Sequence, residues 1–257
     1  FILEDTTKKW SLYAVKTNTF ILKSEYNEIK PFADGLAIVA KMQDGKTLYG
    51  AIDKTGKLVV PILYKYLGNA SEGLLCFSRD KGYGFIDKNN KEVIPAIYRS
   101  MVAFKSGLAC VSLLDSTYYG YIDKKNNWVI KPKYLRGGDF KDNYAVVFTT
   151  RNYTLGSDNG GVIDKTGKEV IPATYDMAND FCNGLSAVKI NNKCGYINKA
   201  GKVVIPFNYE MVSDFQSDIA LVKLNGKIIQ IDKTGKEIPV LKKVGYVNNS
   251  SNTIAIS

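Results

Sequence analysis

Hydrophobic and polar positions alternate in short runs along this chain, and the same runs return several times. One segment, residues 49–61, reads Tyr-Gly-Ala-Ile-Asp-Lys-Thr-Gly-Lys-Leu-Val-Val-Pro, and copies of it stand at 83–95, 119–132, 160–172 and 194–206. Short apolar runs bounded by Gly, Asn or Pro are typical of β-strands joined by tight turns. No segment shows a sustained period of about 3.6 residues with helix caps, so the pattern predicts almost no helix.

The repeat has a nearly constant length. With degenerate copies at each end included, repeats start near residues 12, 50, 84, 120, 161, 195 and 229, with spacings of 38, 34, 36, 41, 34 and 34. All length variation falls just before the next start, where a hairpin tip is expected. A block of fixed length used repeatedly indicates one supersecondary unit that stacks on its neighbours. We therefore expect a single repeat domain over residues 1–257.

The first strand of each repeat ends in Gly-x-Ile-Asp. The second strand carries Val-Ile-Pro. The turn between them has Gly or Asn at one position in every copy, namely Asn18, Gly56, Asn90, Asn126, Gly167, Gly201 and Gly235. Only these residue types adopt a positive φ at low cost, so the turn predicts a β-hairpin. An Asp such as Asp53 begins most of these turns, and we expect it to accept hydrogen bonds from turn amides.

A third strand follows a second small residue, such as Gly107. Its run of four apolar residues, 108–111 in that copy, is typical of a strand covered on both faces. Tyrosines also recur at one place in the repeat and are interpreted as packing between repeats. They are Tyr64, Tyr98, Tyr134, Tyr175 and Tyr209. Each repeat is thus expected to form a three-stranded antiparallel meander, with a short fourth strand between this Tyr and the next Phe.

The expected fold class is all-β, with tandem three-stranded antiparallel meander repeats of about 34–41 residues. Such a meander cannot bury both faces alone and has to stack on its neighbours. Radial stacking would give a seven-unit β-propeller-like disc, which we favour. The alternative is an open linear β-repeat array with exposed ends.

At these residues the sequence resembles the bacterial WG-repeat family. That family's unit looks like Trp-Gly-Tyr-Ile-Asp, a Gly turn, Trp-Val-Ile-x-Pro-x-Tyr, and then Phe-x-x-Gly-Leu-Ala-x-Val. The copy nearest to it begins at Tyr119-Gly120 and continues through Trp128 to Tyr134. Where the family has its first Trp, this chain has Tyr, Gly160 or Cys194. The resemblance implies a repeat scaffold or binding module and carries over no catalytic residue.

Composition adds limits on class and location. Apolar residues make up 45% and charged residues 23%, as in ordinary globular domains. No run approaches the roughly 18 apolar residues of a membrane span, so no membrane insertion is expected. Residues 1–4 are too short and acidic for a signal peptide, and the missing Met indicates a processed chain.

The cysteines at 76, 110, 182 and 194 lack metal or redox spacing and are interpreted as free thiols. A secreted or cell-envelope location is favoured, with the cytoplasm as the alternative.

The chain contains no histidine, which excludes Ser-His-Asp and Cys-His catalysis and every His-ligated metal site. The recurring Asp residues raise the alternative of a propeller enzyme that acts on a glycan, which needs two carboxylates in unlike environments. Here the carboxylates occupy equivalent turn positions beside lysines, so turn capping is the favoured role. We therefore predict a protein that is not an enzyme, with no catalytic residue, cofactor or metal.

The net charge of +10 and the pI near 9.2 direct attention to the lysines. One turn position holds Lys54, Lys88, Lys124, Lys165, Lys199 and Lys233. Stacked repeats would place them along one positive rim, suited to an anionic polymer such as nucleic acid or a cell-wall polymer. The longest insertion, 147–161, adds Arg151 and Tyr153 as candidate binding residues. The favoured function is a non-enzymatic scaffold or binding module for a protein or cell-envelope ligand such as a polysaccharide, with polymer binding through the lysine rim as an alternative.

Overall fold

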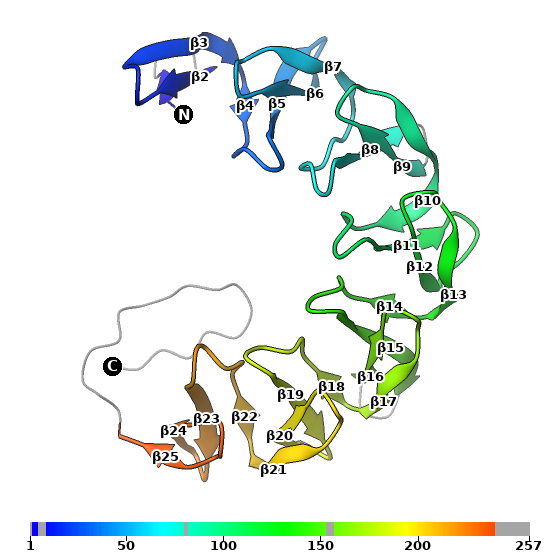
Figure 1. Ribbon diagram of the computed structural model, residues 1–257, viewed down its shortest axis with the longest axis vertical. Coiled ribbons are helices and arrows are strands. Elements are labelled where there is room, and N and C mark those ends of the chain that lie inside the picture. Colours follow the sequence, from blue (N-terminus) through cyan, green and yellow to red (C-terminus); the bar gives the residue numbers. More distant parts are fainter. Residues whose placement is uncertain (1, 5–8, 80–81, 153–156, 240–257) are drawn as a thin grey trace. The chain divides into compact units, whose positions relative to one another are not determined.

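The computed structural model describes residues 2–4, 9–79, 82–152 and 157–239, in which the regular elements are β-strands (Figure 1). None of these residues belongs to a helix long and apolar enough to cross a membrane. The chain divides into two compact units, Phe1–Asp180 and Phe181–Ser257. Within each sheet, strands that follow one another in the chain pair antiparallel, as in β5 with β6 and β19 with β20. The prediction of an all-β fold of tandem antiparallel meanders is confirmed.

In the N-terminal unit the sheets run β1-β2-β3, β4-β5-β6-β7, β8 through β13, and β14-β15-β16-β17. The strands are β1 (Ile2–Glu4), β2 (Lys9–Ala14), β3 (Thr19–Tyr26), β4 (Glu28–Ile29), β5 (Leu36–Gln43), β6 (Lys46–Asp53), β7 (Leu58–Tyr64), β8 (Leu74–Arg79), β9 (Gly82–Asp87), β10 (Glu92–Met101), β11 (Ala109–Leu113), β12 (Tyr119–Ile122), β13 (Trp128–Tyr134), β14 (Arg136–Gly137), β15 (Tyr144–Asn152), β16 (Ser157–Asp164), β17 (Glu169–Tyr175) and β18 (Met177–Ala178).

In the C-terminal unit β19, β20 and β21 follow one another in one sheet, and β22 to β25 form another. These strands are β19 (Leu185–Ile190), β20 (Lys193–Asn198), β21 (Val203–Tyr209), β22 (Met211–Val212), β23 (Ala220–Leu224), β24 (Lys227–Ile231) and β25 (Glu237–Ile238). The short strand expected between Tyr and Phe of the repeat is present as β4, β14, β18 and β22.

The sheets are offset from the sequence repeats. In the β4–β7 sheet, β4 and β5 come from the repeat that starts near 12, and β6 and β7 come from the next one. The sequence grouping would place β8 with β6 and β7, whereas β8 pairs with β9 in the following sheet. The reason lies in the hairpin tip. Asp44 and Gly45 both have positive φ, and this tight two-residue turn makes β5 and β6 one continuous ladder.

The hydrophobic core lies between successive sheets. Residues 36–40 of β5 are all buried, as the apolar run predicts. Ala37 and Val39 pack in one cluster with Leu12 and Tyr26 of the preceding sheet, while Ile38 packs in another with side chains of β8 and β9. Because alternate residues of a strand point to opposite faces, β5 contributes to the core on both sides. The strand therefore holds its neighbours together within the N-terminal unit.

The Gly at the start of the repeat lies against the backbone of the next strand. A Cβ at Gly120 would lie 2.4 Å from the carbonyl oxygen of Ile130, and one at Gly84 would lie 2.5 Å from that of Ile94. The same contact recurs at Gly50 and Gly195. The register of the ladder shifts here, between Tyr119 and Tyr121 in one copy, and the bulged strand crosses close above the Gly. Only a residue without a side chain fits this crossing.

The recurring tyrosines link successive repeats. Tyr64 donates a hydrogen bond to Asn90 Oδ1 and Tyr98 donates one to Asn126 Oδ1, each at 2.6 Å. Both asparagines are the positive-φ residues of the next turn along the chain. The interpretation of these tyrosines as packing between repeats is confirmed for these two residues.

Tyr134 departs from this arrangement. Its ring is completely buried, and among the described residues its hydroxyl group has no hydrogen-bond partner. The position that holds Asn90 or Asn126 in the earlier copies is Gly167 here, so the acceptor is missing. Burial raises the pKa of Tyr134. An unpartnered buried hydroxyl destabilises the fold by about 1–3 kcal/mol.

Closure of the seven repeats into one disc-shaped domain stays a prediction, which small-angle scattering on the monomer tests. A compact chain of this length is expected to have a radius of gyration of about 18 Å. An open array adds length with each repeat, so a value above about 24 Å would favour the linear arrangement.

Candidate functional site

Two kinds of turn lie at the same edge of each sheet. In the β4–β7 sheet, residues 53–57 join β6 to β7, and residues 33–36 form a tight turn that leads into β5. Leu36 pairs with Asp53 in the β5–β6 ladder, so the two turns are neighbours. We call this edge the turn edge. Turns such as residues 53–57 are called the Asp turns, and turns such as residues 33–36 are called the short turns. The corresponding pairs in other sheets are Leu74 with Asp87, Tyr144 with Asp164, and Leu185 with Asn198.

The Asp turns are built around the carboxylate that opens them. Oδ1 of Asp53 accepts hydrogen bonds from the Thr55 amide at 2.8 Å, the Thr55 hydroxyl at 2.6 Å and the Lys57 amide at 3.1 Å. Gly56 closes the turn with a φ of 84°. The predicted positive φ is confirmed at Asn18, Gly56, Asn90, Asn126, Gly167, Gly201 and Gly235. The Asp carboxylates therefore cap the turns, as predicted.

These contacts also hold the carboxylates ionised. The Thr55 hydroxyl, followed by the turn amides, lowers the pKa of Asp53, and the equivalent Thr lowers that of Asp164 and of Asp232. The Asn127 side chain has the same effect on the pKa of Asp123. In the copy at 194–206 the turn opens with Asn198, which is uncharged. Its Oδ1 accepts the same two amide hydrogen bonds, at 3.0 Å each.

We expect the melting temperature to fall as the pH drops below about 4. A carboxylate whose pKa is lower in the folded than in the unfolded state stabilises the fold above its unfolded pKa. That stabilisation is lost as the pH falls through the folded pKa. Replacing Asp53, Asp123, Asp164 and Asp232 together by Asn should flatten the acid limb, because Asn198 shows that Asn keeps the amide contacts. An unchanged acid limb in differential scanning calorimetry would contradict this assignment.

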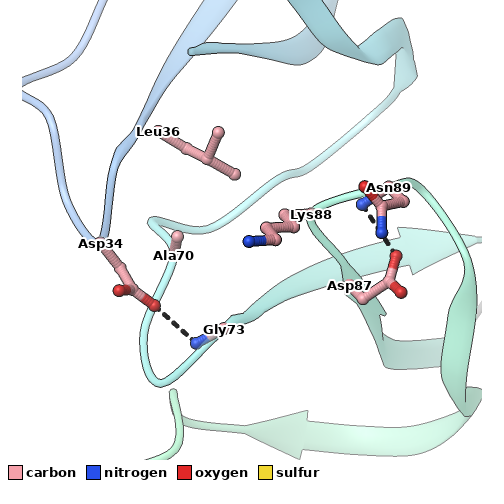
Figure 2. A pocket seen from close by; sticks show the side chains of 7 residues that line it. All are labelled: Asp34, Leu36, Ala70, Gly73, Asp87, Lys88 and Asn89. Carbon is pink, nitrogen blue, oxygen red and sulfur yellow. Dashed lines mark hydrogen bonds between the residues drawn. The ribbon is translucent and has the colours of Figure 1, made fainter. Parts of the chain in front are cut away.

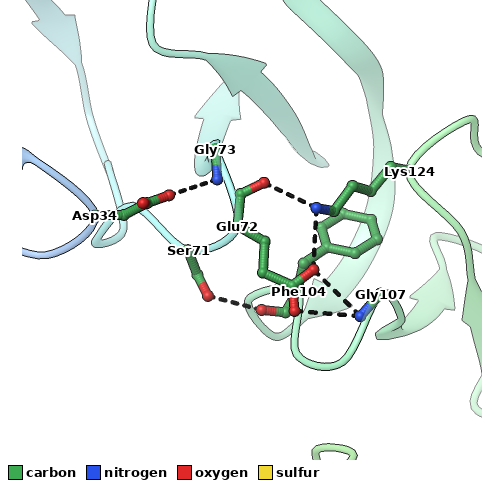
Figure 3. A network of polar contacts seen from close by, with 7 residues as sticks. All are labelled: Asp34, Ser71, Glu72, Gly73, Phe104, Gly107 and Lys124. Atoms are coloured by element: carbon green, nitrogen blue, oxygen red, sulfur yellow. Dashed lines mark hydrogen bonds and ion pairs between the residues drawn. The ribbon is translucent and has the colours of Figure 1, made fainter.

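The short turns form a chain of hydrogen bonds from one sheet to the next (Figure 3). Asp34 Oδ2 accepts the Gly73 amide at 2.5 Å, and both carboxylate oxygens of Glu72 accept the Gly107 amide at 3.2 Å. Asn183, at the equivalent position of the C-terminal unit, instead donates from Nδ2 to the Phe215 carbonyl at 2.9 Å. The turn edge is thus braced between neighbouring sheets.

Glu72 additionally binds a lysine of an Asp turn. The Lys124 ammonium lies 3.0 Å from Glu72 Oε2 and 2.9 Å from the Glu72 carbonyl oxygen (Figure 3). Burial alone would raise the pKa of Glu72, but the Lys124 hydrogen bond and charge and the Gly107 amide together lower it. Asp34 and Glu72 have positive φ, as do Ser106, Asp142, Asn183 and Ser217 at the same position. The sequence analysis singled out only the small residue after each of them.

The equivalent place around Asp34, Gly73 and Lys88 is open. A cavity of about 190 Å³ lies there, lined by Asp34, Leu36, Ala70, Gly73, Asp87, Lys88 and Asn89. Figure 2 shows the Lys88 ammonium directed into this space, with Asp34 on one side and Asp87 on the other. In the described part of the chain Lys88 makes no ion pair.

The predicted binding residues are placed as follows. Lys54, Lys88 and Lys124 are exposed, and Lys165, Lys199 and Lys233 are half-buried, each in an Asp turn. Lys124 pairs with Glu72, and Lys233 pairs with Asp218 at 2.8 Å. Arg151 belongs to β15, and Tyr153 lies outside the described residues. The structure thus brings individual lysines next to carboxylates.

Cys76 and Cys110 are free cysteines with buried side chains. Burial raises the pKa of Cys76 and of Cys110 to about 12, so both are thiols at neutral pH. No group of three or more His, Cys, Asp or Glu within the described segments is positioned to hold a metal ion.

Comparison with a family model identifies the repeat. The model of the WG containing repeat matches residues 16–46, 49–81, 83–117, 119–149, 161–194 and 195–227. The chain belongs to the WG-repeat family. The Gly of the family's name is the residue that lies against the crossing strand, as Gly120 does in the copy at 119–132. No curated protein matches this WG-repeat chain.

Several solved structures resemble the WG-repeat chain at low sequence identity. A crystal structure of the eukaryotic initiation factor matches 89% of this chain and 70% of its own, with a TM-score of 0.56 and 13% identity. The β-propeller domain of the Trilobed protease from Pyrococcus furiosus matches 91% of this chain and 90% of its own, with a TM-score of 0.40 and 9% identity. Hsv2p of Kluyveromyces lactis covers 80% of this chain and 75% of its own, with a TM-score of 0.45 and 10% identity. The first likeness concerns the fold alone.

Proposed function

We propose that this WG-repeat protein is a non-catalytic binding module that presents its turn edge to a protein or a cell-envelope polysaccharide. The observation that carries the proposal is the construction of that edge. Each Asp turn holds its own Asp or Asn in backbone hydrogen bonds, and the short turns brace one sheet against the next. An edge that repeats the same kind of turn from sheet to sheet is suited to a ligand that also repeats.

The side chains left for a ligand are mainly those of the lysines. Lys54 and Lys88 are exposed and make no ion pair among the described residues. A lysine ammonium can donate hydrogen bonds to carbonyl, hydroxyl and carboxylate oxygens, which proteins and polysaccharides offer. Individual contacts of this kind are weak, and several of them along one edge would produce useful avidity.

The test is co-sedimentation with insoluble polysaccharides, namely peptidoglycan, chitin and cellulose, using native protein and two matched triple variants. Lys54→Gln/Lys88→Gln/Lys124→Gln changes the turn edge. Lys46→Gln/Lys193→Gln/Lys227→Gln changes exposed lysines at the hairpin tips, at the other ends of the strands. We expect only the first variant to lose binding, and the pelleted polysaccharide to gain no new reducing ends. Equal loss in both variants, or cleavage of the polymer, would contradict the proposal.

A second candidate, binding of an anionic polymer, is favoured by the net charge of +10. Heparin and duplex DNA are the probes. If phosphates are contacted on DNA, the logarithm of affinity should fall with the logarithm of salt concentration with a slope of about −0.9 per contact. Neutralising Lys54, Lys88, Lys124, Lys165 and Lys199 should flatten that slope. Binding to chitin or cellulose that does not change with salt concentration would favour the first candidate instead.

A further inference from the structure

Two equivalent corners of the N-terminal unit differ in two respects. Each contains a carboxylate of a short turn, a Gly of the next sheet whose amide donates a hydrogen bond to that carboxylate, and the lysine of an Asp turn. The first corner has Asp34, Gly73 and Lys88, and the second has Glu72, Gly107 and Lys124. The carboxylate is shorter by one methylene group in the first corner, and Ala70 stands there where the second corner has the larger Phe104.

The second corner is closed by its own side chains. Glu72 is long enough to accept the Gly107 amide and to reach the Lys124 ammonium at 3.0 Å at the same time. Lys124 also donates to the Glu72 carbonyl oxygen at 2.9 Å. Every charge at this corner therefore has a partner within the chain.

The first corner is left open. The shorter Asp34 accepts the Gly73 amide through Oδ2 but makes no ion pair with Lys88, and a cavity of about 190 Å³ lies between them. Asp87 holds two turn amides through Oδ1, each at 2.9 Å. In the described segments, neither Asp34 Oδ1 nor Asp87 Oδ2 accepts a hydrogen bond. The cavity therefore offers one ammonium group to a ligand, with the side chains of Asp34 and Asp87 in its lining and Leu36 and Ala70 as its apolar part.

We propose that this cavity, hereafter the Lys88 pocket, binds a small free α-amino acid. The ligand's carboxylate would accept hydrogen bonds from the Lys88 ammonium, and its own ammonium would donate to Asp34 Oδ1 or Asp87 Oδ2. Charge-assisted hydrogen bonds of this kind are the strong ones. A short side chain would lie against Leu36 and Ala70. This inference goes beyond the proposed function and does not rest on it.

Charge and size favour this ligand class over others. The two carboxylates outnumber the single ammonium, so a simple anion such as phosphate or acetate would be repelled. A simple amine would leave Lys88 without an acceptor. The cavity corresponds to about six water molecules at roughly 30 Å³ each, which is room for glycine or alanine.

The test is NMR titration of isotope-labelled protein with glycine and L-alanine, with acetate and methylamine as probes that carry one charge each. We expect both amino acids to shift the amides of Gly73 and Asn89 in a saturable manner, and acetate and methylamine to bind at least tenfold more weakly. Saturation by acetate at the same concentration, or no saturable shift with glycine and alanine up to 50 mM, would overturn the proposal.

Two variants and one control make the test specific. Lys88→Gln should weaken binding of alanine by about tenfold or more, because one charge-assisted contact is lost. Asp34→Glu should abolish binding by closing the corner as Glu72 does, while the protein stays folded. Lys124→Gln changes the closed corner and should leave the affinity for alanine unchanged. Unaltered binding by Asp34→Glu, with a native-like spectrum, would show that alanine binds elsewhere.

Discussion

Gly120→Ala is expected to lower the free energy of unfolding by about 3 kcal/mol, the upper range for an overpacked site. The new Cβ would lie 2.4 Å from the Ile130 carbonyl oxygen and 2.7 Å from the Pro132 nitrogen. Both are backbone atoms, so no side chain can rotate away, and β12 or β13 has to move. Urea denaturation monitored by circular dichroism gives the free energy.

Gly138→Ala is the matched control, because a Cβ there would meet its nearest atom, the Val146 carbonyl oxygen, at 3.4 Å. This is ordinary contact, and a loss below about 0.5 kcal/mol is expected. Similar losses in the two variants would mean that close backbone approach is not what requires Gly at position 120.

The second large effect is expected at Gly167, where two substitutions should act in opposite directions. Gly167→Val should destabilise the fold by about 2 kcal/mol, since a β-branched residue is strained at the φ of 83° found there. Gly167→Asn should stabilise it by about 1 kcal/mol, because its side-chain oxygen would supply the acceptor that the Tyr134 hydroxyl lacks. The Asn Cβ would meet Ile130 carbons at 3.1 Å, which a small side-chain movement relieves.

Tyr134→Phe separates the two contributions to the Gly167 result. In the Phe background the hydroxyl is gone, so Gly167→Asn should no longer stabilise the protein. Lys165→Ala, two residues away, should change the unfolding free energy by less than about 0.5 kcal/mol. If Asn stabilises equally with Tyr or Phe at position 134, the gain comes from the turn backbone and not from the hydroxyl.

The local features of the fold could be predicted from sequence because each depends on neighbours in the chain. The positive φ of Gly56 follows from the turn chemistry of residues 53–57, and so does the capping by Asp53. The burial of β5 on both faces follows from the continuous apolar run at 36–40. Such features need no knowledge of which strands pair.

The offset of the sheets could not be predicted in this way, because it depends on which of two loops is tight. A hairpin was expected at the tip of Asp44 and Gly45 and is found there. The repeat pattern did not show that β8 would be separated from β7 and pair with β9. The candidate site was predicted only in part. Lys88 was singled out, but Asp34, which lines the same cavity, lies in another repeat, and their proximity depends on how two sheets pack.

The offset between sheets and sequence repeats has a consequence for how the chain can change its length in evolution. A duplicated segment of one repeat can supply two strands that complete the sheet before it and two that begin the sheet after it, as β2 and β3, and then β4 and β5, do in the repeat that starts near 12. The inserted copy therefore meets the same surfaces as the original copy did. Gene duplication or deletion of a whole repeat changes the number of sheets without requiring a new interface.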